Sequence, residues 1–398
     1  MSVTLRSFAK INLGLCIGGL RADGFHELRT VYQTIALHDV IRVHVKRGMG
    51  IEIRCEDARV PKDQSNTCYR IVERAMELLE VRGRAVIEIE KRLPVQGGLG
   101  GASGNAVAAL MGLEIALKKR LSLADKLRIA GEVGSDLPLF LISGTVLGTG
   151  RGEEVYPLPD LPPVHCVVGL PEISVSTPQA FADWDLSSGG AGTLAREGLA
   201  KEQSNKQNPA ELRSAWTGKS ARPYTSKSQD LRLRMKQKPA ERSSALTLRL
   251  RSGQAYEDAR PSMNPPELTG SDPSDRMNEF SRRISAWLSS ASGVPVGKGR
   301  GRAETPLLDL VRTGIGNDFE KVVFPKYPEL REAKSVLECA GAFYASLSGS
   351  GSAIYGLFES GAVARMAVRR LAEVGVKSEA TMTLSRPQYW KKFLVSGF

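Results

Sequence analysis

Hydrophobic residues follow two clear spacings in the first 183 residues of the chain. Between residues 40 and 46, Ile41, Val43 and Val45 alternate with polar side chains, which is typical of a strand with one buried face. Elsewhere apolar residues recur every three or four positions, which is typical of amphipathic helices. The pattern predicts a compact α/β unit with strands at 40–46 and 85–91, helices at 65–83 and 103–118, and a third helix with a capping-box start at Ser122 that ends at Gly134.

The pattern is lost between about Ser187 and Met263, where Ser, Lys, Arg, Gln and Ala dominate and large apolar residues are few. Such a stretch cannot bury enough apolar surface to balance the entropy of ordering its backbone. We therefore expect residues 187–263 to be a disordered or loosely attached basic, low-complexity insertion.

Regular spacing returns near Asp272. The residues after it predict an α+β unit of its own. Its expected elements are helices at 275–292, 325–341 and 361–375, and a strand, glycine turn and second strand over 344–358.

The charge of the chain is concentrated in the insertion. Of the net charge of +12, +8 lies between Arg196 and Arg260, where 15 Lys and Arg accompany 7 Asp and Glu. A nucleic-acid-binding arm is the alternative to a plain insertion. It is disfavoured because the segment has little aromatic interleaving and no recognisable nucleic-acid-binding module.

Composition narrows the class of protein. The 398 residues are 41% hydrophobic and 25% charged, as in soluble globular proteins, and no apolar run approaches the length of a membrane span. The first residues carry neither a signal-peptide nor a transit-peptide pattern, so we expect a cytoplasmic protein without a membrane partner. Five scattered cysteines without a C-x-x-C pair, and four histidines without metal-ligand spacing, predict neither disulfides nor a metal site.

The stretch PVQGGLGGASGNAVAAL, residues 94–110, joins a glycine-rich loop to a helix. Glycine permits positive φ, so successive backbone amides can converge on an anion, and the helix N-terminus adds further amides. Ser103, Gly104 and Asn105 stand where a Walker A loop has Gly-Lys-Ser/Thr, and the dinucleotide fingerprint fails at Ser103. By itself the stretch leaves two interpretations open, a phosphate site and a tight turn.

Three further stretches accompany this loop: FAKINLGLCIGGLRADGFHEL at 8–28, GSDLPLFLISGTVLGTGRGE at 134–153 and LSGSGSAIYGLF at 347–358. Together they resemble the ordered motifs of the GHMP kinases, and the resemblance covers roughly 1–185 and 265–390. Within that superfamily, AKINLGL, RADGFHEL, ISVSTPQAF (173–181) and NDFE (317–320) are most similar to the enzymes that act on 4-diphosphocytidyl-2-C-methyl-D-erythritol.

The resemblance implies a two-domain α+β fold. Residues 1–158 would form a ribosomal-protein-S5-like N-terminal ATP-binding domain, and residues 159–398 a ferredoxin-like C-terminal domain that contains the insertion. It also implies a reaction, ATP-dependent phosphorylation of the substrate's 2-hydroxyl in the methylerythritol phosphate route to isoprenoids. Mg²⁺ would accompany ATP, the other partner would be a cytidine-diphosphate derivative of a sugar alcohol, and the chain would be a monomer or a weak homodimer.

The family's catalytic pair maps onto Lys10 and Asp136. In the family a lysine and an aspartate flank the acceptor hydroxyl. The alternative for Asp136, which precedes Pro138, is an ordinary turn or cap residue. The alternative for Lys10, within an apolar run, is a side chain that extends from an edge strand to solvent.

The resemblance assigns the other site residues in two groups. The nucleotide group would bind the phosphates through backbone amides and approach the adenine or ribose, and consists of Gly97, Gly98, Leu99, Gly100, Gly101, Ala102, Ser103, Asn66 and Lys91. In the substrate group two phenylalanines would sandwich the cytosine, His26 would bind the base edge and the C-terminal glycines would approach a phosphate. It consists of Asn12, Phe25, His26, Thr177, Phe181, Gly349 and Gly351. Helix capping for Asn66, a strand-end position for Lys91 and core packing for the phenylalanines are the structural alternatives.

The loop departs from the usual family pattern at three positions. Gln96 and Ala102 replace glycines, and we expect both to favour negative φ. Gly104 replaces a serine and removes a hydroxyl group. Three other functions stay open: a homoserine or mevalonate type of kinase, an inactive relative disrupted by the insertion, and nucleic-acid binding through the basic segment.

Overall fold

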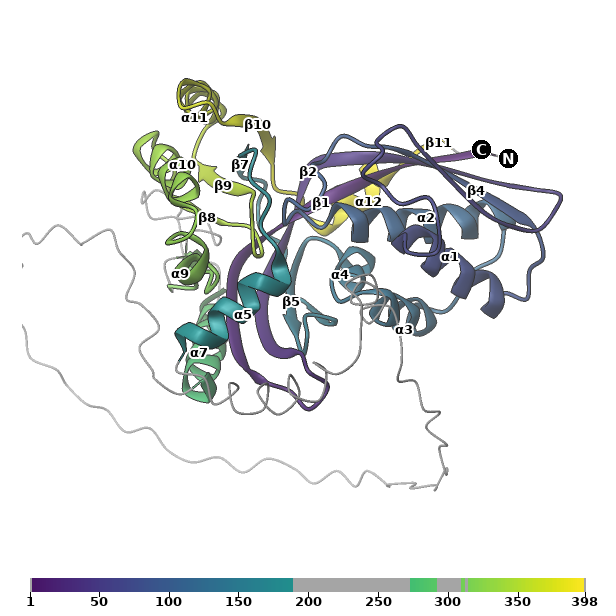
Figure 1. Cartoon of the computed structure of the whole chain (residues 1–398), viewed down its shortest axis with the longest axis horizontal. Coiled ribbons are helices and arrows are strands. Elements are labelled where there is room, and N and C mark those ends of the chain that lie inside the picture. The colour runs from purple at the N-terminus through teal and green to yellow at the C-terminus, as the bar shows by residue number, and fades with distance from the viewer. Residues whose placement is uncertain (1, 189–272, 292–308, 312–313, 397–398) are drawn as a thin grey trace, which may run out of the picture. The chain divides into compact units, whose positions relative to one another are not determined.

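The computed structural model describes residues 2–188, 273–291, 309–311 and 314–396 (Figure 1). The expected insertion at 187–263 therefore lies outside the described residues from position 189 onward, as does the possible nucleic-acid-binding arm. Both stay predictions.

Two long antiparallel strands, β1 (Ser2–Leu20) and β2 (His26–Lys46), form the centre of the first sheet (Figure 1). Its strand order is β11-β1-β2-β4-β3, and β5 and β6 extend it beside the first half of β2. Every residue of β1 from 7 to 18 is buried, because helices or strands cover both of its faces. The remaining strands are β3 (Gly50–Cys55), β4 (Arg84–Glu90), β5 (Thr145–Thr149), β6 (Glu154–Pro157) and β11 (Leu394–Ser396).

Five helices pack with this sheet around its hydrophobic core. The central helix begins in the glycine-rich loop, and its own Ala, Val and Leu side chains are buried on nearly every side. These helices are α1 (Thr67–Leu78), α2 (Gly101–Leu117), α3 (Leu123–Val133), α4 (Leu137–Ile142) and α12 (Arg386–Phe393).

A second, fully antiparallel sheet has the order β10-β7-β9-β8, with α10 and α11 packed against it. This is the architecture expected of a ferredoxin-like C-terminal unit, so the predicted α+β fold class is confirmed. Its strands are β7 (His165–Leu170), β8 (Tyr344–Leu347), β9 (Ile354–Phe358) and β10 (Lys377–Met382). The helices nearby are α5 (Thr177–Ser187), α7 (Pro273–Ala291), α9 (Glu320–Val323), α10 (Pro328–Cys339) and α11 (Gly361–Glu373).

Most predicted elements are confirmed, with shifted ends. The first predicted helix ends at Leu78 rather than near Gly83, because Glu80 adopts a left-handed φ of 50°. The second begins at Gly101, two residues early, so it includes part of the glycine loop. The predicted capping at Ser122 is present. The domain division at 158 stays a prediction, and the last strand, β11, pairs with β1 in the first sheet.

Two other expectations concern the described residues as a whole. All five cysteines are free, and four of them are buried. Across the described ranges, no helix has both the length and the apolar character needed to cross a bilayer.

Close packing of α2 on the sheet predicts opposite effects for two glycine substitutions. A Cβ atom at Gly112 would lie 2.8 Å from side-chain carbons of both Leu5 and Val43, whereas one at Gly131 of α3 would meet nothing nearer than 3.9 Å. We expect Gly131→Ala to raise the free energy of unfolding by about 0.5–1 kcal/mol, the helical preference for Ala over Gly. Overpacking makes Gly112→Ala destabilising by about 1–2 kcal/mol. Urea unfolding of both variants tests this, and equal stabilisation by both would contradict it.

Candidate active site

The predicted nucleotide residues all line one pocket. This glycine-loop pocket has a volume of about 330 Å³ and is formed by the glycine loop (Gly97–Ser103), the start of α1 and the end of β4. Val60, Cys68 and Ile89 contribute apolar walls, suited to a flat base, and the loop contributes backbone amides. The predicted residues among the lining are Asn66, Lys91, Gly97, Gly98, Leu99, Gly100, Gly101, Ala102 and Ser103.

The loop reaches its shape through left-handed residues. Gly98 and Gly100 have φ of 75° and 69°, which glycine adopts at little cost. The expectation of a negative φ at Gln96 is wrong, because Gln96 has a φ of 62°. Ala102 lies in the first turn of α2, where an ordinary side chain is tolerated.

The glycine at position 104 has a packing reason. A Cβ atom there would lie 2.8 Å from Ser7 Oγ and 2.9 Å from the carbonyl oxygen of Phe8. Since α2 crosses β1 this closely, a serine at 104 would require the helix to move. The departure from the family pattern therefore preserves the position of the loop in this chain.

A second turn from the other end of the chain meets the glycine loop. We define this C-terminal glycine turn as Ser348–Ser352. Ser348 Oγ donates to the carbonyl oxygen of Gly98 at 2.9 Å, and the amide of Ala353 donates to that of Gly97 at 3.1 Å. A Cβ atom at Gly98 would lie only 2.1 Å from the carbonyl oxygen of Ser348.

Lys10 and Asp136 come together beside these two turns. Lys10 Nζ lies 3.5 Å from Asp136 Oδ2, although the residues are on β1 and at the start of α4. The amide of Lys10 donates to the carbonyl oxygen of Leu99 at 3.0 Å, which attaches this part of β1 to the glycine loop. A Cβ atom at Gly349 would be 3.5 Å from Lys10 Nζ, so the C-terminal glycine turn borders the same ammonium group.

Asp136 occupies the turn and N-cap position that its structural alternative predicted, whereas Lys10 does not extend to solvent. Asp136 is the N-cap residue of α4, yet its side chain makes no capping hydrogen bond. Lys10 is on a central strand with its side chain 4% exposed, and its ammonium group also donates to Asn12 Oδ1 at 2.7 Å. The Lys10 ammonium group therefore points toward Asp136 rather than to solvent, whereas the Asp136 side chain is 35% exposed and does not bond the helix backbone.

Burial makes Lys10 electrostatically unusual. Desolvation lowers its pKa from 10.5, and the negative charge and hydrogen bond of Asp136 only partly oppose that change.

Asn66 and Lys91 have structural partners as well as positions in the pocket. Asn66 caps α1 by accepting from the amide of Cys68 at 2.8 Å. Lys91 Nζ contacts Asp39 Oδ2 at 2.6 Å, and Asn105 Nδ2 donates to the same oxygen at 2.9 Å. The helix-cap alternative for Asn66 is therefore realised, and a role in nucleotide binding for either residue stays a prediction.

Four of the seven predicted substrate residues lie at the β1–β2 hairpin or on α5: Phe25, His26, Thr177 and Phe181. Phe25 is 38% exposed, and the guanidinium of Arg151 lies 4.9 Å from its ring centroid. Phe181 stacks on His26, with ring centroids 5.1 Å apart and planes 4° from parallel. The imidazole also contacts the Gly18 carbonyl at 3.2 Å and Asp185 Oδ1 at 3.1 Å, so a hydrogen bond to a base would replace one of these contacts.

Asn12, Thr177 and Gly351 complete the substrate group. Asn12 is buried next to Lys10, and its amide donates to Thr30 Oγ1 at 2.8 Å. The hydroxyl groups of Thr177 and Ser350 are 2.7 Å apart, which places the start of α5 against the C-terminal glycine turn. Gly351 has a φ of 94°, a conformation that favours glycine in this turn.

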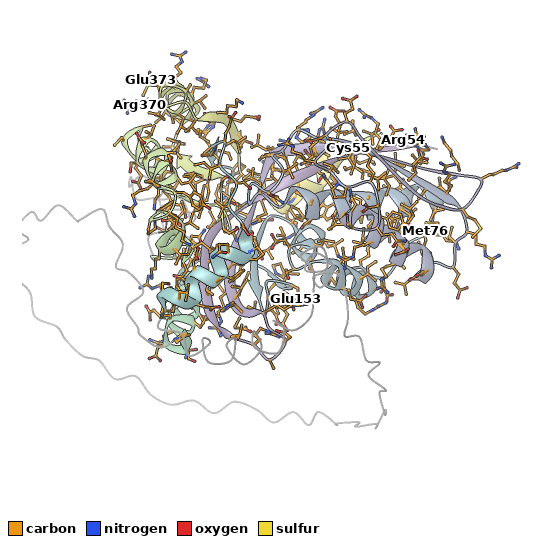
Figure 2. All side chains as sticks on the ribbon, viewed as in Figure 1. Arg54, Cys55, Met76, Glu153, Arg370 and Glu373 are labelled. Carbon is orange, nitrogen blue, oxygen red and sulfur yellow. The ribbon has the colours of Figure 1, made fainter. Side chains whose placement is uncertain are left out.

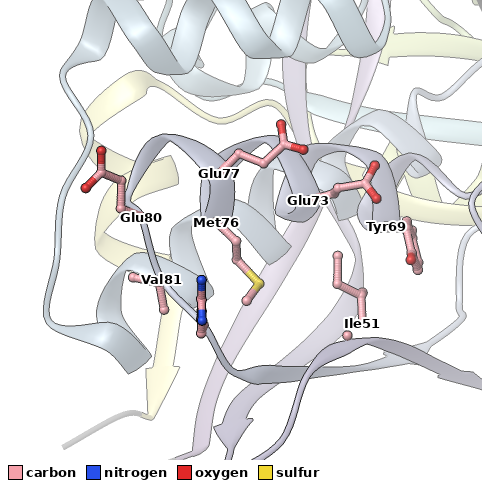
Figure 3. A pocket seen from close by; sticks show the side chains of 9 residues that line it. Ile51, Tyr69, Glu73, Met76, Glu77, Glu80 and Val81 are labelled. Carbon is pink, nitrogen blue, oxygen red and sulfur yellow. The ribbon is translucent and has the colours of Figure 1, made fainter.

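A larger pocket, of about 540 Å³, lies between α1 and β3 (Figure 3). Ile51, Met76 and neighbouring side chains form it, and Glu73, Glu77 and Glu80 are at its border. These carboxylates would repel a triphosphate. The glycine-loop pocket is therefore the better anion site despite its smaller volume.

Comparison with known proteins agrees with this geometry. The family described as GHMP kinases N terminal domain matches residues 66–144, and the family described as GHMP kinases C terminal matches residues 304–377. The 4-diphosphocytidyl-2-C-methyl-D-erythritol kinase of Solibacter usitatus is 31% identical over 369 residues, which span 93% of this chain and 85% of that protein. The chain belongs to the 4-diphosphocytidyl-2-C-methyl-D-erythritol kinase family of the GHMP kinases. The enzyme of the same name from Acaryochloris marina is 29% identical, with 92% of this chain and 91% of the relative aligned.

Solved structures of the family share the fold. A crystal structure of 4-(cytidine 5'-diphospho)-2C-methyl-D-erythritol kinase matches with a TM-score of 0.57 and 23% identity, over 96% of this chain and 99% of that one. Homoserine kinase from Cytophaga hutchinsonii matches with a TM-score of 0.56 and 16% identity, over 96% and 95% of the two chains. The near-equal scores mean that the backbone alone does not separate these two kinds of GHMP kinase.

Sequence reasoning missed three polar residues that build the site. Tyr32 donates to Asp136 Oδ1 at 3.0 Å, and fully buried Asp39 accepts from Lys91 and the amides of residues 92 and 93. Asn317 donates to the carbonyl oxygens of Leu347 and Gly349, both at 2.8 Å. Asn317 belongs to the quoted NDFE stretch, but Tyr32 and Asp39 carry no motif that spacing could have revealed.

The lowered pKa of Lys10 predicts a pH-dependent stability difference between the wild type and Lys10→Met. From the folded-state pKa up to the unfolded value of 10.5, the unfolded chain holds one proton more than the folded chain. Wild-type stability therefore rises with pH through this window relative to the variant, by about 1.4 kcal/mol for each unit of pKa shift.

Urea unfolding at pH 7 and pH 10 measures this difference. Lys62→Met removes an exposed lysine and serves as the control, for which we expect no comparable change. A Lys10→Met difference that is the same at both pH values would contradict the assignment of a desolvated ammonium group.

Proposed function

We propose that this protein transfers the γ-phosphoryl group of ATP to the 2-hydroxyl of 4-diphosphocytidyl-2-C-methyl-D-erythritol, a step of the methylerythritol phosphate route to isoprenoids. The observation that carries the proposal is the Lys10–Asp136 pair, 3.5 Å apart and attached to the glycine loop through the hydrogen bond between the Lys10 amide and Leu99. A triphosphate donor and a hydroxyl acceptor need such an arrangement, because phosphoryl transfer depends on alignment and charge stabilisation.

In this proposal ATP lies in the glycine-loop pocket with its phosphates on the amides of Gly97–Ser103. Four of these seven residues are glycines, which leaves backbone amides accessible, and a Cβ atom at Gly101 would lie 3.2 Å from Lys91 Nζ. The described ranges contain no group of three or more His, Cys, Asp or Glu side chains placed to hold a metal. Mg²⁺ therefore enters with ATP, as magnesium commonly does with nucleotide phosphates.

Asp136 acts as the base and Lys10 as the cation. The oxygen of the 2-hydroxyl forms a bond to the γ-phosphorus while the bond from that phosphorus to the β,γ-bridging oxygen breaks. The hydroxyl proton moves to Asp136, and ADP leaves with the bridging oxygen. Lys10 lies beside the developing charge, where a fixed ammonium in a buried site is worth more than one in water.

The cytidine part of the acceptor would lie at the β1–β2 hairpin. A base stacked on Phe25 would lie on the ring face opposite Arg151, with Phe181 and His26 completing the subsite. Thr177 and the C-terminal glycine turn, with Gly349 and Gly351, would border the diphosphate and the sugar alcohol. Location in the cytoplasm and a monomer or weak homodimer stay predictions.

Competition between acceptors tests the function. We expect turnover of ATP with 4-diphosphocytidyl-2-C-methyl-D-erythritol, and none above background with homoserine or mevalonate, which carry no base to stack. Preferential phosphorylation of either of these two would contradict the proposed substrate. Absence of turnover with all three would favour an inactive relative.

The base subsite has its own test. Phe25→Leu removes an aromatic face, and base–aromatic stacking is worth about 1–3 kcal/mol, so we expect KM for the cytidine substrate to rise about 5- to 100-fold. KM for ATP should stay within about twofold, because Phe25 is not part of the glycine-loop pocket. Tyr156→Leu, at an aromatic residue that is 53% exposed, is the matched control. An unchanged KM in Phe25→Leu would remove Phe25 from the substrate group.

A further inference from the structure

The two oxygens of the Asp136 carboxylate have different partners. Tyr32 Oη donates to Oδ1 at 3.0 Å, whereas Lys10 Nζ lies 3.5 Å from Oδ2. The backbone does not orient this carboxylate through a cap, because Asp136 makes no side-chain hydrogen bond to the first turn of α4. Its orientation therefore depends on the side chains that contact it from β1 and β2.

Tyr32 is held firmly enough to supply that orientation. It lies on β2 with 2% of its surface exposed. A Cβ atom at Gly148 would lie 2.5 Å from Tyr32 Cε2, and one at Gly152 would lie 2.5 Å from Tyr32 Oη. Two glycines in and after β5 thus make a slot that fits the phenol and directs its hydroxyl at Asp136.

The charged groups around the phenol come from three further elements. Lys10 of β1 lies 5.7 Å from the ring centroid, and Asp136 is at the start of α4. Glu153, labelled in Figure 2, is near Tyr32 in the β5–β6 turn, where Arg151 Nε donates to it at 2.9 Å. Burial, then the charge of Asp136 and its hydrogen bond, raise the pKa of Tyr32 well above 10, so the phenol remains a hydrogen-bond donor at physiological pH.

We propose that Tyr32 is a positioning residue for the phosphoryl transfer. Its hydroxyl donates a hydrogen bond to Asp136 Oδ1, so that Oδ2, the oxygen beside Lys10, receives the proton of the acceptor hydroxyl. This inference rests on the proposed function. Tyr32 itself exchanges no proton, and the transferred hydrogen moves from the acceptor oxygen to Oδ2. A base held at one oxygen needs less reorganisation when the acceptor arrives, which is how well-aligned groups raise a rate.

The hydrogen bond also has a consequence for pH dependence. A hydrogen-bond donor on a carboxylate favours its ionised form. The acid limb of the pH–kcat profile should therefore move toward neutral pH in a variant without the hydroxyl. A residue that served only to fill space would not move this limb.

Tyr32→Phe keeps the ring and removes the hydroxyl. With ATP and 4-diphosphocytidyl-2-C-methyl-D-erythritol we expect kcat to fall about 10- to 100-fold, as for loss of one hydrogen bond to a charged group. The acid limb should move to higher pH, while the affinity for ATP stays unchanged. Tyr156→Phe makes the same chemical change at an exposed tyrosine and should behave as the wild type.

A double-mutant cycle distinguishes positioning from general damage. If Tyr32 acts through Asp136, Tyr32→Phe should cause little further loss in an Asp136→Asn background. Three results would each overturn the proposal. The first is an equal loss of kcat in both backgrounds, and the second is an unchanged pH profile with wild-type kcat. The third is loss of ATP affinity and folding together with turnover. Turnover by the wild type tests the proposed function by itself. A wild type without turnover contradicts both the proposed function and the role of Tyr32. An active wild type whose kcat and pH profile are unchanged in Tyr32→Phe contradicts only the role of Tyr32.

Discussion

The close backbone contact between the glycine loop and the C-terminal glycine turn is the constraint on which the site depends. Gly98 approaches the carbonyl oxygen of Ser348 so nearly that a Cβ atom would lie 2.1 Å from it. Segments some 250 residues apart in sequence meet there. The Lys10 amide then attaches β1 to the loop through Leu99, and Gly349 borders the Lys10 ammonium group. Side chains larger than hydrogen would separate these three segments, and the glycine-loop pocket would lose its alignment with Lys10 and Asp136.

The second constraint is the cost of burying charged groups, which ion pairs and hydrogen bonds lower. Lys10 is nearly dehydrated, with Asp136 and Asn12 as its partners. Fully buried Asp39 has Lys91, Asn105 and two backbone amides around it. An isolated charge in such surroundings would be costly, whereas a paired and hydrogen-bonded one is tolerated. One network lies beside the loop and the other below the start of α2, so the same contacts that lower the cost of burial also hold the loop in place.

The sequence predicted the parts that depend on local chemistry. Alternation identified the strands at 40–46 and 85–91, and glycines followed by helix formers identified the loop and α2. The family resemblance predicted that Lys10 and Asp136 form a pair, and in the fold their charged groups lie 3.5 Å apart. Tyr32 and Asp39 were missed because an isolated tyrosine or aspartate has no spacing that indicates its partner. Gln96 was misjudged: it has a φ of 62° and directly precedes Gly97, whose carbonyl oxygen accepts from the Ala353 amide.

The homology and the fold separate the candidate functions to different degrees. The backbone is nearly as similar to a homoserine kinase as to a 4-(cytidine 5'-diphospho)-2C-methyl-D-erythritol kinase, whereas the sequence relatives carry the latter type of name over most of the chain. One fold can serve several acceptors through different side chains around its site. We propose that this distinction depends on Phe25 and Phe181.

The central claim is that Asp136 removes the proton of an acceptor hydroxyl beside ATP held on the glycine loop. The most direct test is the rate of phosphoryl transfer by Asp136→Asn at saturating ATP and acceptor, measured together with the dissociation constant for ATP. The account predicts a fall of at least about 100-fold in rate, the usual size of a general-base contribution, with the ATP dissociation constant unchanged. A rate within about tenfold of the wild type would contradict it.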